Sequence, residues 1–277
     1  MYPINPFLTH QRSLRFTCPL APLLESVATG GPLYVHARNW LAELAAITPL
    51  TGIVIDDEEK VALLPEVGLQ ISLKSIEAVH GVEIRHRESQ VLAVEMATRG
   101  EPRSISIAAI PRMSDMDHFI GALRGHPSET LREEEYQQWR NDFIIRPKMC
   151  PCCAAAAEER RAAPENNPLT RIFCSAIGEK RALRCSIVSP HFSFATWLAP
   201  KSLQFSGGVI GVIAEDGKSM LEVDTGLCYL LKIVRRRFDG ESFTVLKVYD
   251  SMGILQLEIS THGWEAERSW HELCQGR

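Results

Sequence analysis

Three cysteines, Cys150, Cys152 and Cys153, form the tightest group of reactive side chains in the sequence, in the run Met-Cys-Pro-Cys-Cys. The C-x-x-C spacing within this run suits a zinc ion or thiol–disulfide exchange. A closed structural zinc site needs a second pair of ligands at similar spacing, and the sequence contains no second C-x-x-C. A zinc-based or thiol-based sensor is therefore one interpretation, and exposed cysteines in a linker are the other.

Other catalytic patterns are missing from the sequence. It has no G-x-G-x-x-G, G-x-x-x-x-G-K-[ST] or G-x-S-x-G motif, which leaves the usual phosphate-binding loops and the nucleophile elbow without support. No Ser-His-Asp set and no pair of catalytic carboxylates can be assembled from spacing alone. His36, His80 and His86 fall in strand-like runs without a partner at a fixed spacing.

The composition is that of a folded globular protein, with 277 residues of which 45% are apolar and 23% charged. Its 30 Lys and Arg against 34 Asp and Glu give a net charge of −4, so no global positive field favours a nucleic acid partner. No run approaches the roughly 20 apolar residues of a membrane-spanning helix, and the N-terminal sequence lacks the pattern of a secretory signal. We therefore expect a cytoplasmic protein with reduced cysteines, no membrane span and no nucleic acid partner.

One stretch of the chain separates two halves. Residues 146–167, RPKMCPCCAAAAEERRAAPENN, are rich in alanine, proline and charge and carry no strand alternation. We interpret them as a linker between an N-terminal domain, 1–145, and a C-terminal domain, 168–277. Each domain contains a series of short strand-like runs and closes with a helical pattern. In the first closing helix Ser114 is the expected N-cap.

The two halves also resemble each other. Residues 78–107 align with residues 229–259, which places Arg85 near Arg236 and Gly100 on Gly253. A period of about 150 residues implies duplicated domains rather than a solenoid. Consecutive antiparallel strands capped by helices predict an α+β fold of two homologous halves, each a large antiparallel sheet flanked by helices.

Three segments resemble the HemS/ChuS type of cytoplasmic heme-handling proteins, together with its ChuX/HutX-like relatives. Residues 30–50, GGPLYVHARNWLAELAAITPL, resemble the family's opening, in which a glycine and an apolar strand precede a helix. Residues 202–224 resemble a strand pair of the family. Residues 232–260 resemble its signature of an Arg-Lys-Pro-Thr run followed by Asp-Gly, but Arg237 stands in place of the proline and Phe238 in place of the threonine.

The resemblance implies a heme held between a helix that carries an axial histidine and arginines that pair with the propionates. Heme is a flat apolar plate with two carboxylates and an iron, so such a site needs apolar walls, cations and an axial donor. On this basis His118 is the candidate iron ligand, and Arg38, Arg235 and Arg236 are candidate heme-binding residues. The alternatives are an ordinary helix histidine, a surface salt bridge of Arg38, and a solvated strand end at Arg235–Arg237.

Two further kinds of axial donor remain open. Cys18-Pro19 and Cys150-Pro151 are Cys-Pro dipeptides, and a soft anionic sulfur is a good axial ligand of ferric heme. His191 is a candidate ligand in the second half, or a strand or loop histidine beside aromatic core.

The leading hypothesis is therefore a cytoplasmic heme-binding protein of heme and iron utilisation, acting as an intracellular heme carrier or as a heme-degrading protein. A carrier implies a heme oxygenase or another cytosolic protein as partner. The alternative is a diverged relative that kept the fold, lost heme, and serves as a regulatory or protein-interaction module.

Overall fold

The computed structural model describes residues 9–28, 31–50, 52–56, 58, 60–86, 89–98, 101–142 and 149–275. Over these residues the strands form two large antiparallel sheets, of 10 and 8 strands, accompanied by six α-helices. The predicted α+β class with antiparallel sheets flanked by helices is confirmed. None of the helices in this part of the chain is long and apolar enough to cross a membrane.

The chain divides into two compact units. Unit 1 comprises Met1–Ala37, Ala46–Ile145 and Pro190–Ser193, and unit 2 comprises Arg38–Ala45, Arg146–Ser189 and Phe194–Arg277. The predicted domains 1–145 and 168–277 are continuous in sequence. Each compact unit, in contrast, includes a short segment from the other half of the chain. The domain boundaries therefore stay a prediction.

The segment expected to be a linker, 146–167, contains helix α4 (Pro151–Ala162) and lies in unit 2. Cys150 is the N-cap of this helix and Pro151 its first residue, a position where the missing N–H of proline has no helical partner to lose. Four consecutive alanines follow, and alanine has the highest helix propensity. The linker interpretation rested on the lack of strand alternation in these residues and did not take their helix propensity into account.

Unit 1 is built on an antiparallel sheet with the strand order β10-β1-β7-β8-β9-β2. Its strands are β1 (Thr9–Phe16), β2 (Pro32–Arg38), β7 (Ile76–His86), β8 (Ser89–Thr98), β9 (Glu101–Ala109) and β10 (Ser128–Leu131). A separate antiparallel meander consists of β4 (Val54–Asp56), β5 (Val61–Leu64) and β6 (Leu69–Ser72). The helices are α1 (Leu20–Ala28), α2 (Met116–Arg124) and α3 (Glu133–Asp142).

Helix α3 brings a large side chain onto this sheet. Tyr136 is fully buried and packs against Val82, Ala93 and Ala108, which are neighbours on β7, β8 and β9. Three glutamates lie in the first turn of α3, where the positive end of the helix dipole favours them.

The residues after Asn39 form a strand, β3 (Ala42–Pro49), and the helix implied there by the family resemblance is wrong. The Asn39 Oδ1 atom accepts hydrogen bonds from the backbone N–H groups of Leu41 and Ala42, and the Asn39 N–H donates to the Ala42 carbonyl. This side chain closes a tight turn that reverses the chain after β2. A turn at Asn39 leaves an alternating apolar run, which continues as a strand.

Unit 2 contains an antiparallel sheet with the order β16-β17-β18-β11-β12. Its strands are β11 (Leu183–Val188), β12 (Phe192–Leu198), β16 (Leu230–Phe238), β17 (Glu241–Tyr249) and β18 (Leu255–His262). A second antiparallel group is β13 (Pro200–Ser206), β14 (Val209–Ala214) and β15 (Ser219–Asp224).

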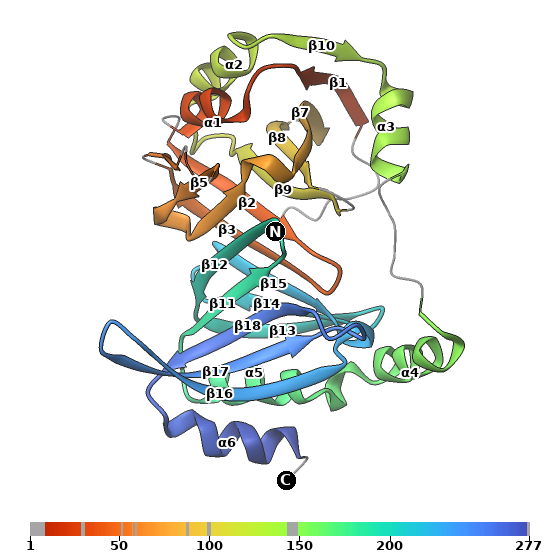
Figure 1. Ribbon diagram of the computed structural model, residues 1–277, viewed down its shortest axis with the longest axis vertical. Helices are drawn as coiled ribbons and strands as arrows, with labels where there is room; N and C mark the ends of the chain where they lie inside the picture. The colour runs from red at the N-terminus through yellow and green to blue at the C-terminus, as the bar shows by residue number, and fades with distance from the viewer. Residues whose placement is uncertain are drawn as a thin grey trace. The chain divides into compact units, whose positions relative to one another are not determined.

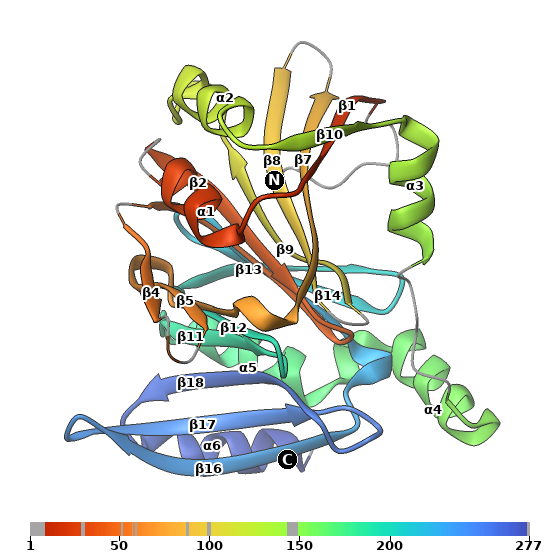
Figure 2. The ribbon, with the colours of Figure 1, turned by 45° about the horizontal axis from the view of Figure 1, so that its top comes forward.

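Two helices of unit 2, α5 (Pro168–Gly178) and α6 (Glu265–Cys274), lie together on one face of the β16–β18 strands (Figures 1 and 2). They bury Leu169, Ile172, Phe173 and Trp270, so this face of the sheet forms the core of the unit. The opposite face of the same strands carries polar and aromatic side chains, and its outward-pointing row is the site described below.

The aligned segments of the two halves have the same order of elements. Strands β7, β8 and β9 precede α2 in unit 1, and strands β16, β17 and β18 precede α6 in unit 2. Each set is an antiparallel meander followed by a helix. A gene duplication stays a prediction. The N-cap of α2 is Asp115 and not Ser114, because Ser114 instead bonds the Ile110 N–H and the Pro32 carbonyl.

Candidate functional site

A row of exposed and half-buried side chains crosses three strands of unit 2. Arg236 on β16 pairs directly with Phe243 on β17, and Phe243 pairs with His262 on β18. Directly paired residues of antiparallel strands point to the same face, so these three side chains stand side by side. Trp197 of β12 completes the row: its ring is stacked on that of His262 with centroids 4.9 Å apart and an interplanar angle of 2°.

We call Trp197, Phe243 and His262 the aromatic platform. The Phe243 and His262 rings are tilted by 39° with centroids 4.7 Å apart. Trp197 is 43% exposed and the His262 side chain 58% exposed. Large aromatic side chains are usually covered in a folded protein, and an exposed cluster of them marks a surface that a flat apolar ligand can cover.

Charged groups border the platform. Glu258 lies between two cations of the same face, with its Oε1 3.6 Å from the Arg236 Nη2 and 3.2 Å from the Lys247 Nζ. Glu258 and Lys247 are mostly buried, while the Arg236 side chain is 52% exposed. Arg236 is therefore the more accessible of the two cations, and it presents an exposed guanidinium at the edge of the platform. Such a charge is complementary to a carboxylate of a bound ligand.

A carboxylate lies beside the imidazole of His262. Its Nδ1 lies 3.4 Å from Oε2 of Glu241, and the stack on Trp197 fixes the plane of the ring. A carboxylate on one ring nitrogen of histidine orients the other nitrogen and raises its basicity toward a metal. In this arrangement Nε2 is the nitrogen of His262 that suits a metal ion.

Arg235 and Arg236 point to opposite faces of β16, because successive side chains of a strand alternate. Arg235 forms an ion pair with Glu267 of α6, with 2.5 Å between Nη2 and Oε2, and its guanidinium lies over the ring of Trp264. Arg237 also lies over Trp264. Arg236 alone of these three arginines is beside the aromatic platform. The predicted pair of heme-binding arginines is thus separated by the sheet.

Arg38 ends strand β2, and its Nη1 lies 3.8 Å from Oε1 of Glu43. The side chain is 30% exposed. The contact agrees with the alternative interpretation of Arg38 as a residue that forms a surface salt bridge. A role for Arg38 at a heme propionate stays a prediction.

His118 lies in the first turn of α2 in unit 1, where its N–H bonds the Asp115 cap. Its ring Nε2 donates a hydrogen bond of 2.8 Å to the carbonyl of Ser26 in α1. This bond links the two helices, and it leaves Nδ1 as the nitrogen with a lone pair. The contact fits the interpretation as an ordinary helix histidine, while iron ligation by His118 stays a prediction.

A second polar row is buried in unit 1. His80, Glu95, Ser106 and His36 are direct neighbours across β7, β8, β9 and β2. Tyr136 donates a hydrogen bond to Glu95, and its ring meets His80 edge-on with centroids 5.9 Å apart. Burial, with a smaller contribution from Arg15, lowers the pKa of His80 to about 4. The row is a core feature of unit 1, because its histidines and carboxylate are buried.

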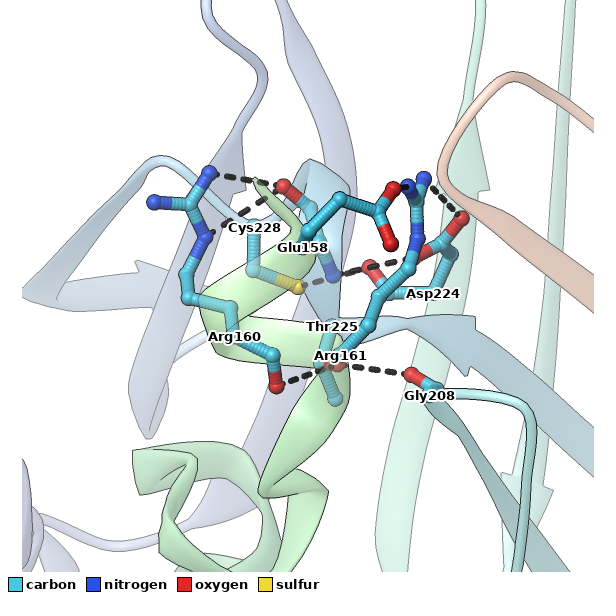
Figure 3. A network of polar contacts seen from close by, with 8 residues as sticks. Glu158, Arg160, Arg161, Gly208, Asp224, Thr225 and Cys228 are labelled. Carbon is cyan, nitrogen blue, oxygen red and sulfur yellow. Dashed lines mark hydrogen bonds and ion pairs between the residues drawn. The ribbon is translucent and has the colours of Figure 1, made fainter. Parts of the chain in front are cut away.

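Helix α4 is fixed to the rest of unit 2 at its C-terminal half (Figure 3). Arg161 grips Asp224 with two hydrogen bonds of 2.9 and 2.8 Å, and its Nη1 bonds Glu158 at 2.6 Å. Arg160 donates to the carbonyl of Gly226, and Thr225 donates to the carbonyls of Arg160 and Gly208. An open cavity of about 490 Å³ beside this network is lined by Arg161, whose charge the two carboxylates already balance.

The cysteines are free thiols. Cys150, Cys152 and Cys153 gather at the N-terminus of α4, with their sulfur atoms within 4.8 Å of one another. Cys18 is half-buried, and Cys185 and Cys228 are buried.

The sequence pointed to Arg236 at the edge of the platform and missed the three residues of the platform itself. Phe243, His262 and Trp197 come from three different strands, and only the strand register brings them beside Arg236. A usable signal was present in β17, where Phe243 and Lys247 alternate with the core residues Leu246 and Val248 and lie on the other face of the strand. The other candidate of this half, His191, lies outside the aromatic platform.

The comparisons with known proteins find similarity in structure only. No family model matches the chain, and the search of curated proteins finds no match. PhuS, described as a heme-binding protein from Pseudomonas aeruginosa, superposes in its heme-bound form with a TM-score of 0.69 at 14% identity, covering 95% of this chain and 86% of that one. ChuS, described as a heme degrading enzyme from Escherichia coli O157:H7, gives 0.69 at 11% identity, covering 96% and 87%.

At these identities the likeness establishes a common fold, and function has to be argued from the site. The fold expected from the HemS/ChuS resemblance of the sequence is confirmed over nearly the whole chain: this protein has the fold of PhuS and ChuS.

Proposed function

We propose that this protein binds heme on the aromatic platform of unit 2 and acts as an intracellular heme carrier in heme and iron utilisation. The observation that carries the proposal is the row of Trp197, Phe243 and His262 with Arg236 at its edge, in which Trp197 and His262 are exposed and Phe243 is half-buried. The common fold with PhuS and ChuS, which are described as heme-binding and heme-degrading, supports the choice of heme as the flat ligand.

The residues present fit the chemistry of heme. The two aromatic side chains, Trp197 and Phe243, offer apolar contact to a porphyrin ring, and His262 offers an imidazole nitrogen to its iron. Arg236 offers a guanidinium, which pairs well with a propionate carboxylate. In contrast, Arg235 is held by Glu267 on the face covered by α6, so its assignment to heme rests on the sequence resemblance alone.

Two histidines compete as iron ligand. His118 comes from the sequence resemblance, and its Nε2 already bonds the Ser26 carbonyl, so ligation through that nitrogen would cost this link between α1 and α2. His262 has its Nδ1 against Glu241, which leaves Nε2 for a metal. We therefore propose His262 as the axial ligand. Replacing each histidine by alanine separates the two, because only the true ligand changes the spectrum of bound hemin.

A carrier and a heme-degrading enzyme differ in what must follow binding. Degradation needs an external electron donor and access of oxygen to the iron, whereas a carrier needs only to release heme to a partner such as a heme oxygenase. The exposed rings of Trp197 and His262 suit transfer to a partner. Adding a reductant or peroxide to the hemin complex distinguishes the two roles: a carrier keeps the porphyrin intact, and a degrading enzyme loses the Soret band.

The test compares hemin with iron-free protoporphyrin IX on the purified full-length protein, by tryptophan fluorescence and absorbance. We expect both to quench fluorescence and hemin to bind more tightly, because only hemin can use the imidazole. If neither compound binds, the protein is instead a heme-free regulatory or interaction module with this fold. If the two bind equally well, the axial ligand is wrong.

A further inference from the structure

We propose that Cys150, Cys152 and Cys153 form a binding site for one thiophilic divalent metal ion, with zinc as the representative ion. This site is separate from the aromatic platform and goes beyond the proposed heme function.

The geometry of the three thiols is the first support. Their sulfur atoms all lie within 4.8 Å of one another, and those of Cys150 and Cys152 are 2.9 Å apart. Zinc bonds thiolate sulfur at about 2.3 Å, so tetrahedral ligands of one ion lie about 3.8 Å apart. Small rotations about the side-chain bonds of these exposed or half-exposed residues bring all three sulfurs to that spacing.

The position at the start of α4 is the second support. Cys150 is the N-cap, and its sulfur accepts a hydrogen bond of 3.4 Å from the backbone N–H of Cys153. Unpaired N–H groups and the helix dipole stabilise negative charge at a helix N-terminus. Three thiolates around a divalent ion carry one net negative charge, so the helix end favours the loaded site.

The three thiols are accessible to an ion from solution, since Cys150 and Cys152 are exposed and Cys153 is half-buried. A thiol gives up its proton when it binds a metal ion, so each of them can supply a thiolate. Cys185 is different, because burial raises the pKa of this lone thiol to about 12 and makes it a poor ligand.

The helix that carries the site is held in place. Arg161 and Arg160, at the other end of α4, fix it to Asp224 and Gly226 (Figure 3). The three cysteines occupy the N-cap and the first turn, so the backbone sets their relative positions. Fixed ligands lose less conformational entropy when they bind a metal than ligands on an extended linker do.

The coordination is open. Within the described part of the chain, the group contains these three residues and no fourth histidine, cysteine or carboxylate. The preceding residues 143–149, FIIRPKM, include no such side chain either. A fourth position would be filled by water or an external ligand, as in exchangeable zinc sites rather than closed structural ones.

The test titrates the reduced, heme-free full-length protein with Co²⁺ and then displaces it with Zn²⁺. We expect one ion per chain, with thiolate-to-cobalt charge-transfer bands and the visible bands of a tetrahedral ion. Removal of an outer-shell partner of a metal typically costs about 10- to 100-fold in affinity, so loss of a ligand in Cys152→Ser should weaken binding by at least about 100-fold.

Cys174→Ser is the matched control, because Cys174 is an exposed lone thiol on α5, and its affinity should equal that of the wild type. Circular dichroism of Cys152→Ser checks that the fold is kept. Absence of charge-transfer bands, equal affinity in Cys152→Ser, or a disulfide among the three cysteines in place of metal binding would each overturn the proposal. None of these outcomes bears on hemin binding.

Discussion

The indole of Trp197 and the imidazole of His262 lie parallel, with ring centroids 4.9 Å apart and planes within 2° of each other. They come from β12 and β18, and both remain exposed. A stacked histidine next to a carboxylate has a fixed ring plane and one defined ligating nitrogen. This relationship makes the open face of unit 2 a candidate ligand surface.

Replacing Trp197 by alanine removes the largest apolar contact of the aromatic platform. One aromatic contact contributes about 1 kcal/mol beyond burial, so we expect the Kd for hemin to rise about fivefold or more. Absorbance titration measures the change. Phe205→Ala, which removes another exposed aromatic side chain from the β13–β14 hairpin, is the control and should leave the Kd unaltered.

Arg236 and Arg235 form a matched pair on the two faces of β16. Arg236→Ala should weaken hemin binding by about 1.5 to 3 kcal/mol, the usual size of a hydrogen bond to a charged group, while Arg235→Ala should leave it unchanged. The difference should shrink for a hemin dimethyl ester, whose propionates carry no charge. Equal losses in both variants would show that the face of the strand does not matter and would contradict the assignment.

His80 gives unit 1 a specific response to acid. Its pKa of about 4 in the folded protein is below the value of 6.5 in the unfolded chain, so the unfolded state binds the proton first as the pH falls. The free energy of unfolding should therefore decline between pH 6.5 and pH 4, by about 3 kcal/mol in total, and the contribution is intact above pH 6.5.

Urea unfolding at a series of pH values measures this slope. His80→Phe removes the titrating group and should flatten the slope over this range, whatever its effect on stability at pH 7. The groups around the ring, Arg15, Glu95 and Tyr136, are the same in both proteins. Identical slopes for the two proteins would show that His80 does not take up a proton on unfolding.

Gly208 is a position where only glycine fits. Its φ is +82°, and a Cβ atom there would lie 2.8 Å from the Arg161 Cα. Gly208→Ala should cost about 3 kcal/mol, from the left-handed backbone and from the displacement of α4. Gly217→Ala is the control: it has a φ of +65° with open space around it, and should cost only about 1 to 2 kcal/mol. Thermal unfolding compares the two.

Much of the fold was predictable because the strands follow local alternation. The segments FTVLKVYD and ILQLEIS, for example, read as strands and form β17 and β18. Local reading failed where one residue redirected the chain, as at Asn39, whose side chain closes a turn and makes 42–49 a strand. Local patterns also did not predict helix α5, whose apolar side chains are buried in the core of unit 2.

The candidate site was predictable only in part. Arg236 was visible because it lies in a motif, but its partner His262 follows from register, since both pair with Phe243. The separation of Arg235 from Arg236 follows from strand alternation and was readable from sequence once β16 was assigned. The stacking of Trp197 on His262 depends on the position of β12 in the sheet, and a local sequence pattern does not predict that position.

The central claim is that His262 on the aromatic platform binds heme iron, and a hemin titration of the wild type, His262→Ala and His271→Ala tests it most directly. His271 is an exposed histidine on α6 and serves as the control. The account predicts a shifted Soret band at one hemin per chain for the wild type and His271→Ala, and a weakened and spectrally changed complex for His262→Ala. An unshifted Soret band in the wild type, or identical spectra and affinities in all three proteins, would contradict it.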